Sequence, residues 1–271
     1  MKNIVLWING QGNQVALANK INEAYQVKAI VVEKRKSTEK MTASKLYEKI
    51  YQRIFLQEIS ESWNSMQAAY KNKYPNLPDC AVLEVENINS EECLEFTRSH
   101  KPDIIVVSGT RLVKKHMFDI KASIGVVNLH TGLSPYVKGG PNCTNWCIAN
   151  NEPHLIGNTT MWIDEGIDTG SIIATDFVNF TGNETLSEVH VKVMNHAHDL
   201  YVKSIMRAIE DKASCPSVPQ KELGIGKTYY TKMWGLPQKI KLVKNFKNFS
   251  KQVNSPEFVK KRSEYTVLPL E

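Results

Sequence analysis

Apolar residues near the amino terminus change from strand-like to helix-like spacing. Residues 4–8 form a short apolar run, a turn containing Gly10 and Gly12 follows, and apolar residues then recur with helical period over residues 15–24. The β-branched run over residues 27–32 predicts a second strand. Strand, glycine turn, helix and strand in this order predict one βαβ unit of a parallel sheet.

The alternation is interrupted at residues 37–74, where apolar residues keep mostly helical spacing among many Lys and Glu. This pattern predicts one or two amphipathic helices inserted in the domain. Beyond the insertion, strands are predicted at 81–85, 104–108, 126–129 and 157–163, and helices at 90–98 and 187–209. The periodicity weakens after Pro216 and Pro219. We therefore expect an α/β fold with a doubly wound, mostly parallel sheet over residues 1–211, and a small annex at 212–271.

Composition narrows the class of protein. The 271 residues are 42% hydrophobic and 23% charged, as in ordinary globular proteins. The first apolar run is too short for a signal peptide and no run of ~18 apolar residues occurs, so we expect a soluble cytoplasmic protein without a membrane partner. Residues 212–271 hold twelve Lys and Arg against four Asp and Glu. This basic stretch fits contact with phosphates and a solvated surface nearly equally well.

The cysteines and histidines give no metal-binding pattern. The five cysteines are an odd number without a repeated pair, and the seven histidines lack the usual ligand spacing. We expect reduced, mostly buried thiols and no metal site.

Polar residues with catalytic potential lie between Gly125 and Ile173. Asn128 and His130 are two residues apart at the end of a predicted strand, so their side chains share one face. Asp168 lies in a glycine-flanked loop after the next strand. An amide, an imidazole and a carboxylate that meet at the ends of parallel strands can carry out acyl transfer. By itself an Asn-x-His pair at a strand end is more often a turn than a catalytic pair, and the loop alone is equally typical of a capped turn, so both interpretations stay open at this point.

The order of the motifs resembles that of the folate-dependent formyltransferases. The segments in question are Asn128-Leu129-His130, Leu133-Ser134-Pro135 and Ile167-Asp168-Thr169-Gly170, with Gly157–Met161 as the strand before the acidic loop. The family includes glycinamide ribonucleotide formyltransferase, methionyl-tRNA formyltransferase and the nucleotide-sugar N-formyltransferases. The resemblance covers residues 1–211 in arrangement and is specific from about 104 to 173.

The resemblance implies roles for individual residues. His130 would be the general acid and base, Asn128 the donor to the oxyanion, and Asp168 the group that orients and charges His130. The implied cosubstrate is 10-formyltetrahydrofolate, and no metal is needed. It would be bound by Gly109, Arg111, Leu112 and Val113 and by Asp164, Glu165, Gly166 and Ile167.

The sequence departs from the family pattern at two places. Thr131-Gly132-Leu133-Ser134-Pro135 replaces the usual Ser-Leu-Leu-Pro, which puts the shape of the acceptor pocket in doubt, and Met161 stands where several relatives have His.

The chain length and the short annex favour a nucleotide-linked amino sugar as acceptor, in polysaccharide or O-antigen sugar biosynthesis. Gly10, Gly12 and Asn13, at the start of the first helix, would hold a phosphate. Tyr136 and Lys138 would contact the substrate, although a solvated turn explains them equally well.

Other functions remain alternatives. An enzyme of this family could act on the purine intermediate or on methionyl-tRNA, and a protein without activity could be a silent folate- or nucleotide-binding module. The basic annex would suit tRNA, but a nucleic acid partner is not expected. A homodimer is expected by resemblance only.

Overall fold

The computed structural model describes residues 2–36, 42–163 and 169–270. In these residues, seven strands form the main sheet in the order β3-β2-β1-β4-β5-β7-β8. Its strands are β1 (Ile4–Asn9), β2 (Val27–Glu33), β3 (Ala81–Val85), β4 (Ile104–Ser108), β5 (Gly125–His130), β7 (Gly157–Trp162) and β8 (Ile172–Phe177). The two short strands β6 (Val137–Gly139) and β9 (Lys227–Tyr229) pair separately.

The sheet is mostly parallel, as the sequence predicts. Strands β1 to β5 pair in parallel, whereas β7 is antiparallel to both β5 and β8. The predicted strand at 157–163 therefore exists with the opposite direction, and β8 was not anticipated. The short connection between β7 and β8 allows an antiparallel pair, because only parallel neighbours need a long crossover.

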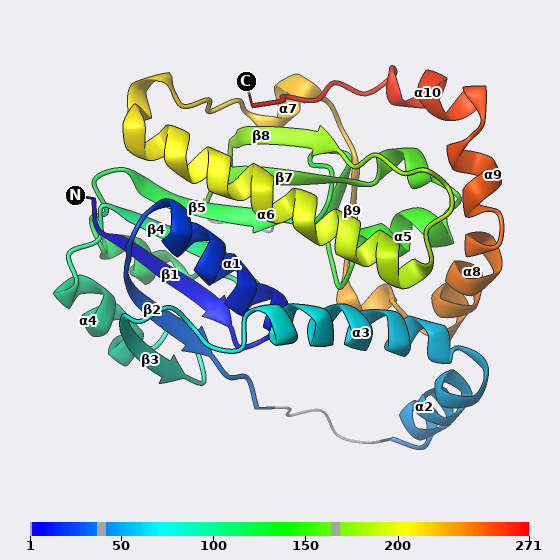
Figure 1. Ribbon diagram of the computed structural model, residues 1–271, viewed down its shortest axis with the longest axis horizontal. Coiled ribbons are helices and arrows are strands. Elements are labelled where there is room, and N and C mark those ends of the chain that lie inside the picture. Colours follow the sequence, from blue (N-terminus) through cyan, green and yellow to red (C-terminus); the bar gives the residue numbers. More distant parts are fainter. Residues whose placement is uncertain (1, 37–41, 164–168, 271) are drawn as a thin grey trace.

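Helices cover both faces of the sheet, which confirms the doubly wound fold (Figure 1). Because successive strand residues point to opposite faces, Leu6 and Ile8 pack with α1 and α6, while Val5 and Trp7 pack on the side of α4. The Trp7 indole N–H donates to the Thr97 hydroxyl on α4 at 3.1 Å. The helices are α1 (Gly12–Ala24), α4 (Glu91–Ser99) and α6 (Leu186–Glu210).

The insertion contains two helices, α2 (Ala43–Phe55) and α3 (Gln57–Lys73). Helix α3 lies along α1 and α6, and its Met66 and Tyr70 share a buried cluster with Ala16 and Met194. Helix α2 extends away from the body (Figure 1) and has no buried residue. Helix α3 of the insertion thus contributes to the core, whereas α2 contributes exposed surface.

The carboxyl-terminal segment wraps around the body (Figure 1). Its helices are α7 (Gln220–Leu223), α8 (Leu236–Phe246), α9 (Phe249–Val253) and α10 (Pro256–Arg262), and the short helix α5 (Cys143–Ala149) lies beneath α8. Leu242, Phe249 and Phe258 share a hydrophobic cluster with Leu133 and Trp146. Residues on both sides of the predicted boundary at 211 therefore share one core.

The thiols are reduced, and most of them are buried. Cys93, Cys143, Cys147 and Cys215 are buried and Cys80 is half-buried, with no disulfide among them. Burial raises the pKa of Cys93 to about 12 and raises the pKa of Cys147 as well, which keeps both thiols protonated and unreactive. Among the described helices, none is long and apolar enough to span a membrane.

Candidate functional site

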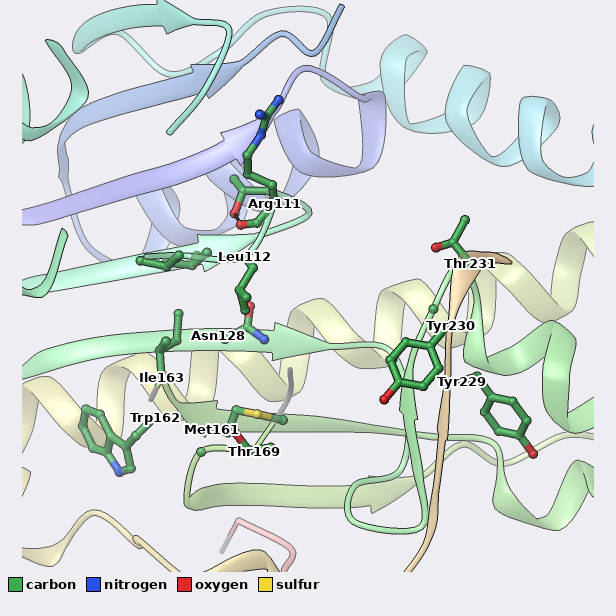
Figure 2. A pocket seen from close by; sticks show the side chains of 16 residues that line it. Arg111, Leu112, Asn128, Met161, Trp162, Ile163, Thr169, Tyr229, Tyr230 and Thr231 are labelled. Carbon is green, nitrogen blue, oxygen red and sulfur yellow. Dashed lines mark hydrogen bonds between the residues drawn. The ribbon is translucent and has the colours of Figure 1, made fainter. Parts of the chain in front are cut away.

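A cleft of about 320 Å³ lies at the carboxyl ends of β4 and β5. Side chains from both halves of the chain line it (Figure 2). The lining residues are Val107, Thr110, Arg111, Leu112, Val113, Asn128, Gly139, Gly140, Met161, Trp162, Ile163, Thr169, Gly170, Tyr229, Tyr230 and Thr231. This is where an open parallel sheet builds a ligand site.

Asn128 lies in the middle of the cleft (Figure 2). It is held on β5 between Val107 of β4 and Met161 of β7. Among the described residues, none forms a hydrogen bond with its side-chain amide. The amide N–H is therefore directed into the cleft by a rigid strand, as a donor to a developing oxyanion must be.

His130 ends β5 and is 8% exposed. Its Nε2 lies 3.3 Å from the Val137 carbonyl oxygen and 3.5 Å from Cys143 Sγ. Since a carbonyl only accepts hydrogen bonds, this contact places the proton of a neutral imidazole on Nε2. Cys143 in turn donates to the Gly139 carbonyl, which leaves its sulfur to accept from Nε2. The loop after β5 thus supplies two contacts to the ring.

The remaining predicted catalytic residue, Asp168, lies outside the described residues, as do Asp164, Glu165, Gly166 and Ile167. Their roles stay predictions. Thr169 and Gly170, which follow this segment, line the cleft. Thr169 and Gly170 therefore lie at the same cleft as Asn128.

The segment expected to bind the formyl donor forms one wall of the cleft. Leu112 is 54% exposed and Val113 is buried, and both line the cavity. Gly109 precedes them, and its carbonyl accepts from Asn9 Nδ2 at 2.9 Å. The Arg111 side chain leaves the cleft, because its guanidinium contacts Glu33 and the Glu86 carbonyl. Arg111 thus faces the cleft mainly with its backbone.

The opposite wall comes from the carboxyl-terminal segment, whose residues at the cleft the sequence did not identify. Strand β9 ends at Tyr229, and Tyr230 and Thr231 follow it; all three residues line the cleft. The strand pairs with β6, where Tyr229 lies opposite Gly139. Tyr229 stacks on Trp146 with ring centroids 4.4 Å apart, and burial raises the pKa of its phenol to about 12. Tyr230 is 46% exposed, and its ring points toward the cleft (Figure 2). A signal for this pairing is missing from the sequence because β6 and β9 are far apart along the chain.

The predicted phosphate site at the start of α1 does not fit the structure. The backbone N–H of Asn13 donates to Gln67 Oε1 at 3.1 Å, and Gln67 Nε2 donates back to Asn13 Oδ1 at 2.9 Å. A methyl group on Gly12 would lie 2.6 Å from the Gln67 carbonyl oxygen. Helix α3 of the insertion therefore covers Gly12 and Asn13, whereas Gly10 remains exposed in the turn.

The structure does not bring Tyr136 and Lys138 to the cleft. Tyr136 is 7% exposed, and its hydroxyl contacts the carbonyls of Leu223 and Thr266 at 2.8 and 2.9 Å. It thus ties the loop after β5 to the end of the chain. Lys138 lies on β6 opposite Thr228. The neighbouring Gly139 and Gly140, rather than these two residues, reach the cavity.

Comparison with known proteins identifies the family. Residues 1–205 match the formyl transferase family. The chain belongs to the formyl transferase family. The match covers the sheet, the insertion and most of α6, and it includes Asn128 and His130.

Curated relatives of the chain are named methionyl-tRNA formyltransferases. The protein from Clostridium tetani is 36% identical over 132 residues, which are 48% of this chain and 42% of that protein. The protein from Clostridium beijerinckii is 38% identical over 146 residues, which are 54% of this chain and 44% of that protein. The chain thus matches less than half the length of either relative.

Solved structures share the fold of this chain at low sequence identity. An N-formyltransferase from Helicobacter canadensis, in complex with folinic acid and dTDP-3-aminofucose, is 18% identical with a TM-score of 0.57 and covers 91% of this chain and 81% of its own. A likely sugar N-formyltransferase from Mycobacterium tuberculosis is 14% identical with a TM-score of 0.56 and covers 90% and 87%. Phosphoribosylglycinamide formyltransferase from Bacillus halodurans is 20% identical with a TM-score of 0.50 and covers 74% and 92%.

Proposed function

We propose that the protein transfers the formyl group of 10-formyltetrahydrofolate to the amine of a nucleotide-linked amino sugar. The observation that carries the proposal is the position of Asn128, between a donor wall at residues 110–113 and a second wall at residues 229–231. A reaction between two bound molecules needs this arrangement, since the acceptor amine and the formyl carbon must meet at the oxyanion donor.

The proposed chemistry assigns one task to each residue. The amine attacks the formyl carbon, and the negative charge that grows on the formyl oxygen is stabilised by the Asn128 amide, at about 3–4 kcal/mol for such a donor. His130 accepts the amine proton and returns a proton to the departing folate nitrogen. Asp168 orients and charges His130. The proposed fit of the donor rests on residues 110–113, which line one side of the cleft.

The second wall supports a nucleotide sugar as acceptor. Tyr230 offers an exposed aromatic face, and Lys232 Nζ lies 5.9 Å from its ring centroid. A base can stack on such a ring while the ammonium group pairs with a phosphate. The N-formyltransferase whose structure contains dTDP-3-aminofucose shares the fold over 91% of this chain.

Methionyl-tRNA is the second candidate, favoured by the names of the sequence relatives and by the basic carboxyl-terminal segment. The purine intermediate has less support, because Gln67 covers the helix start that would hold its phosphate.

The deciding experiment is formyl transfer from 10-formyltetrahydrofolate to each acceptor separately. We expect turnover with an amino sugar linked to dTDP, UDP or GDP. Turnover with methionyl-tRNA alone would replace the sugar proposal, and no turnover with any acceptor would favour the binding module.

Replacing Tyr230 by Ala should weaken nucleotide binding. The loss of a base-stacking ring costs ~1–3 kcal/mol, so the Kd for the nucleoside diphosphate that binds best should rise about tenfold. Calorimetric titration of dTDP, UDP and GDP with the folate site filled measures this. Tyr230→Phe keeps the ring and should bind almost as the unchanged protein does. An equal Kd for the nucleoside diphosphate in all variants would show that Tyr230 does not contribute to the acceptor site.

A homodimer is part of the proposal, and α2 supports it. The helix exposes a continuous apolar stripe, with Leu46 and Ile50 each 50% and Ile54 61% exposed. Its other side faces α8, where Lys239 Nζ lies 2.8 Å from Glu48 Oε1. An apolar stripe that points outward is typical of an interface.

The double change Ile50→Glu and Ile54→Glu should turn the dimer into a monomer, because it places charges on the stripe. Light scattering coupled to gel filtration gives the mass directly. Lys49→Glu, on the same helix beside the stripe, is the matched control and should leave the mass unchanged. An unchanged mass in the double variant would exclude α2 from the interface.

A further inference from the structure

The donor wall has no regular secondary structure between the end of β4 and the short 3-10 helix at Lys115–Asp119. Its conformation is fixed instead by side chains from other loops. Asn89 Nδ2 donates to the Leu112 carbonyl at 3.0 Å, and Asn89 Oδ1 accepts from the Lys114 N–H at 2.7 Å. These two bonds hold the far end of the wall.

The near end is held by one carboxylate. Glu33 is the last residue of β2, and its side chain is fully buried. Oε2 accepts from the Arg111 backbone N–H at 3.0 Å and from Arg35 Nε at 2.6 Å. Oε1 accepts from the Ile88 N–H at 3.2 Å and lies 2.6 Å from Arg111 Nε. Glu33 therefore joins its own loop to the loops that follow β3 and β4.

The charges explain why a carboxylate is needed here. A buried carboxylate is costly unless ionic and hydrogen-bonding partners surround it, and Glu33 has such partners on both oxygens. Bonds between charged groups are also stronger than neutral ones. A neutral Gln would lose one accepting oxygen and would turn an amide N–H toward Arg35 or Arg111.

The wall held in this way presents backbone groups to the cleft. Within the part of the chain that the structure describes, the N–H of Leu112 and the N–H and carbonyl of Val113 make no hydrogen bond with another residue. Both residues line the cavity next to Asn128. A planar heterocycle with alternating donors and acceptors could pair with such groups, provided that the backbone is held still.

We propose that Glu33 is a positioning residue for the formyl donor, which fixes the backbone of residues 111–113 against the cleft without touching the ligand. The inference rests on the proposed donor but not on the identity of the acceptor. The affinity for the formyl donor then depends on a carboxylate in β2, a strand that does not line the cleft.

The test is Glu33→Gln, with folinic acid as the probe in calorimetric titration. Since a small displacement of binding groups is costly, the Kd for folinic acid should rise roughly tenfold or more. In turnover assays the KM for the formyl donor should rise similarly, while kcat and the KM of the acceptor change little. Glu84→Gln is the matched control, because Glu84 is exposed, pairs with Lys34 and makes no contact with the wall.

Asn89→Ala provides a second, independent variant, since Asn89 holds the other end of the same wall. It should raise the Kd for folinic acid and the KM for the formyl donor in the same way, and it decides the question if Glu33→Gln does not fold. A folded Glu33→Gln protein with unchanged folinic acid affinity would overturn the inference about Glu33 but not the proposed formyl donor. Failure of the unchanged protein to bind folinic acid would overturn both the inference and the proposed donor. If both variants unfold, the two residues maintain the fold rather than the wall, and the inference is rejected.

Discussion

Replacement of His130 by Ala or Asn is expected to lower kcat by about 100-fold or more, the usual scale for a general acid and base. The imidazole is held at the end of β5 by the Val137 carbonyl and the Cys143 sulfur. Without it, the attacking amine and the leaving folate nitrogen must exchange protons with water. Donor binding should remain, because the donor wall at residues 110–113 does not involve His130.

The measurement is steady-state turnover together with calorimetric titration of folinic acid. His100→Ala serves as the control, because His100 lies at the end of α4, on an edge of the fold remote from the cleft, and bonds to the Phe96 carbonyl. A His130 variant with the turnover of the unchanged protein would refute the catalytic assignment. Lost turnover combined with lost folinic acid affinity would instead indicate a damaged site.

Gly139→Ala should both destabilise the protein and open the acceptor side of the cleft. Gly139 has a φ of +85°, and an added methyl group would lie 2.0 Å from the Tyr229 carbonyl oxygen. The backbone conformation alone costs about 1–3 kcal/mol in a residue other than Gly. The clash adds to this, because it forces β9 away from β6 and moves Tyr230 and Thr231 with it.

The neighbouring Gly140 offers a matched control. It also lines the cleft, yet an added methyl group at Gly140 meets nothing within 4 Å. Its N–H donates to the Tyr229 carbonyl at 3.0 Å, a bond that Ala keeps. Chemical denaturation should therefore separate the two variants, and the acceptor KM should rise only for Gly139→Ala. Equal stability of the two variants would show that the β6–β9 pairing tolerates displacement.

The sequence by itself determined the layers of the fold and placed Asn128 on a strand that reaches the cleft. Local periodicity places β1, α1 and β2 in order, because burial of one helix face and of both strand faces leaves a pattern within a few residues. The spacing of Asn128 and His130 on one strand likewise fixes that they share a face. The motifs between residues 104 and 173 were sufficient to indicate the family.

Only the tertiary structure decided what covers these elements. The sequence cannot reveal that Gln67 occupies the start of α1, that Tyr136 is bonded to the chain's last residues, or that β9 brings Tyr230 to the cleft. Each of these contacts joins segments more than 50 residues apart. Their geometry depends on how α3 and the carboxyl-terminal segment pack, and packing between distant segments leaves no periodic signal in either one.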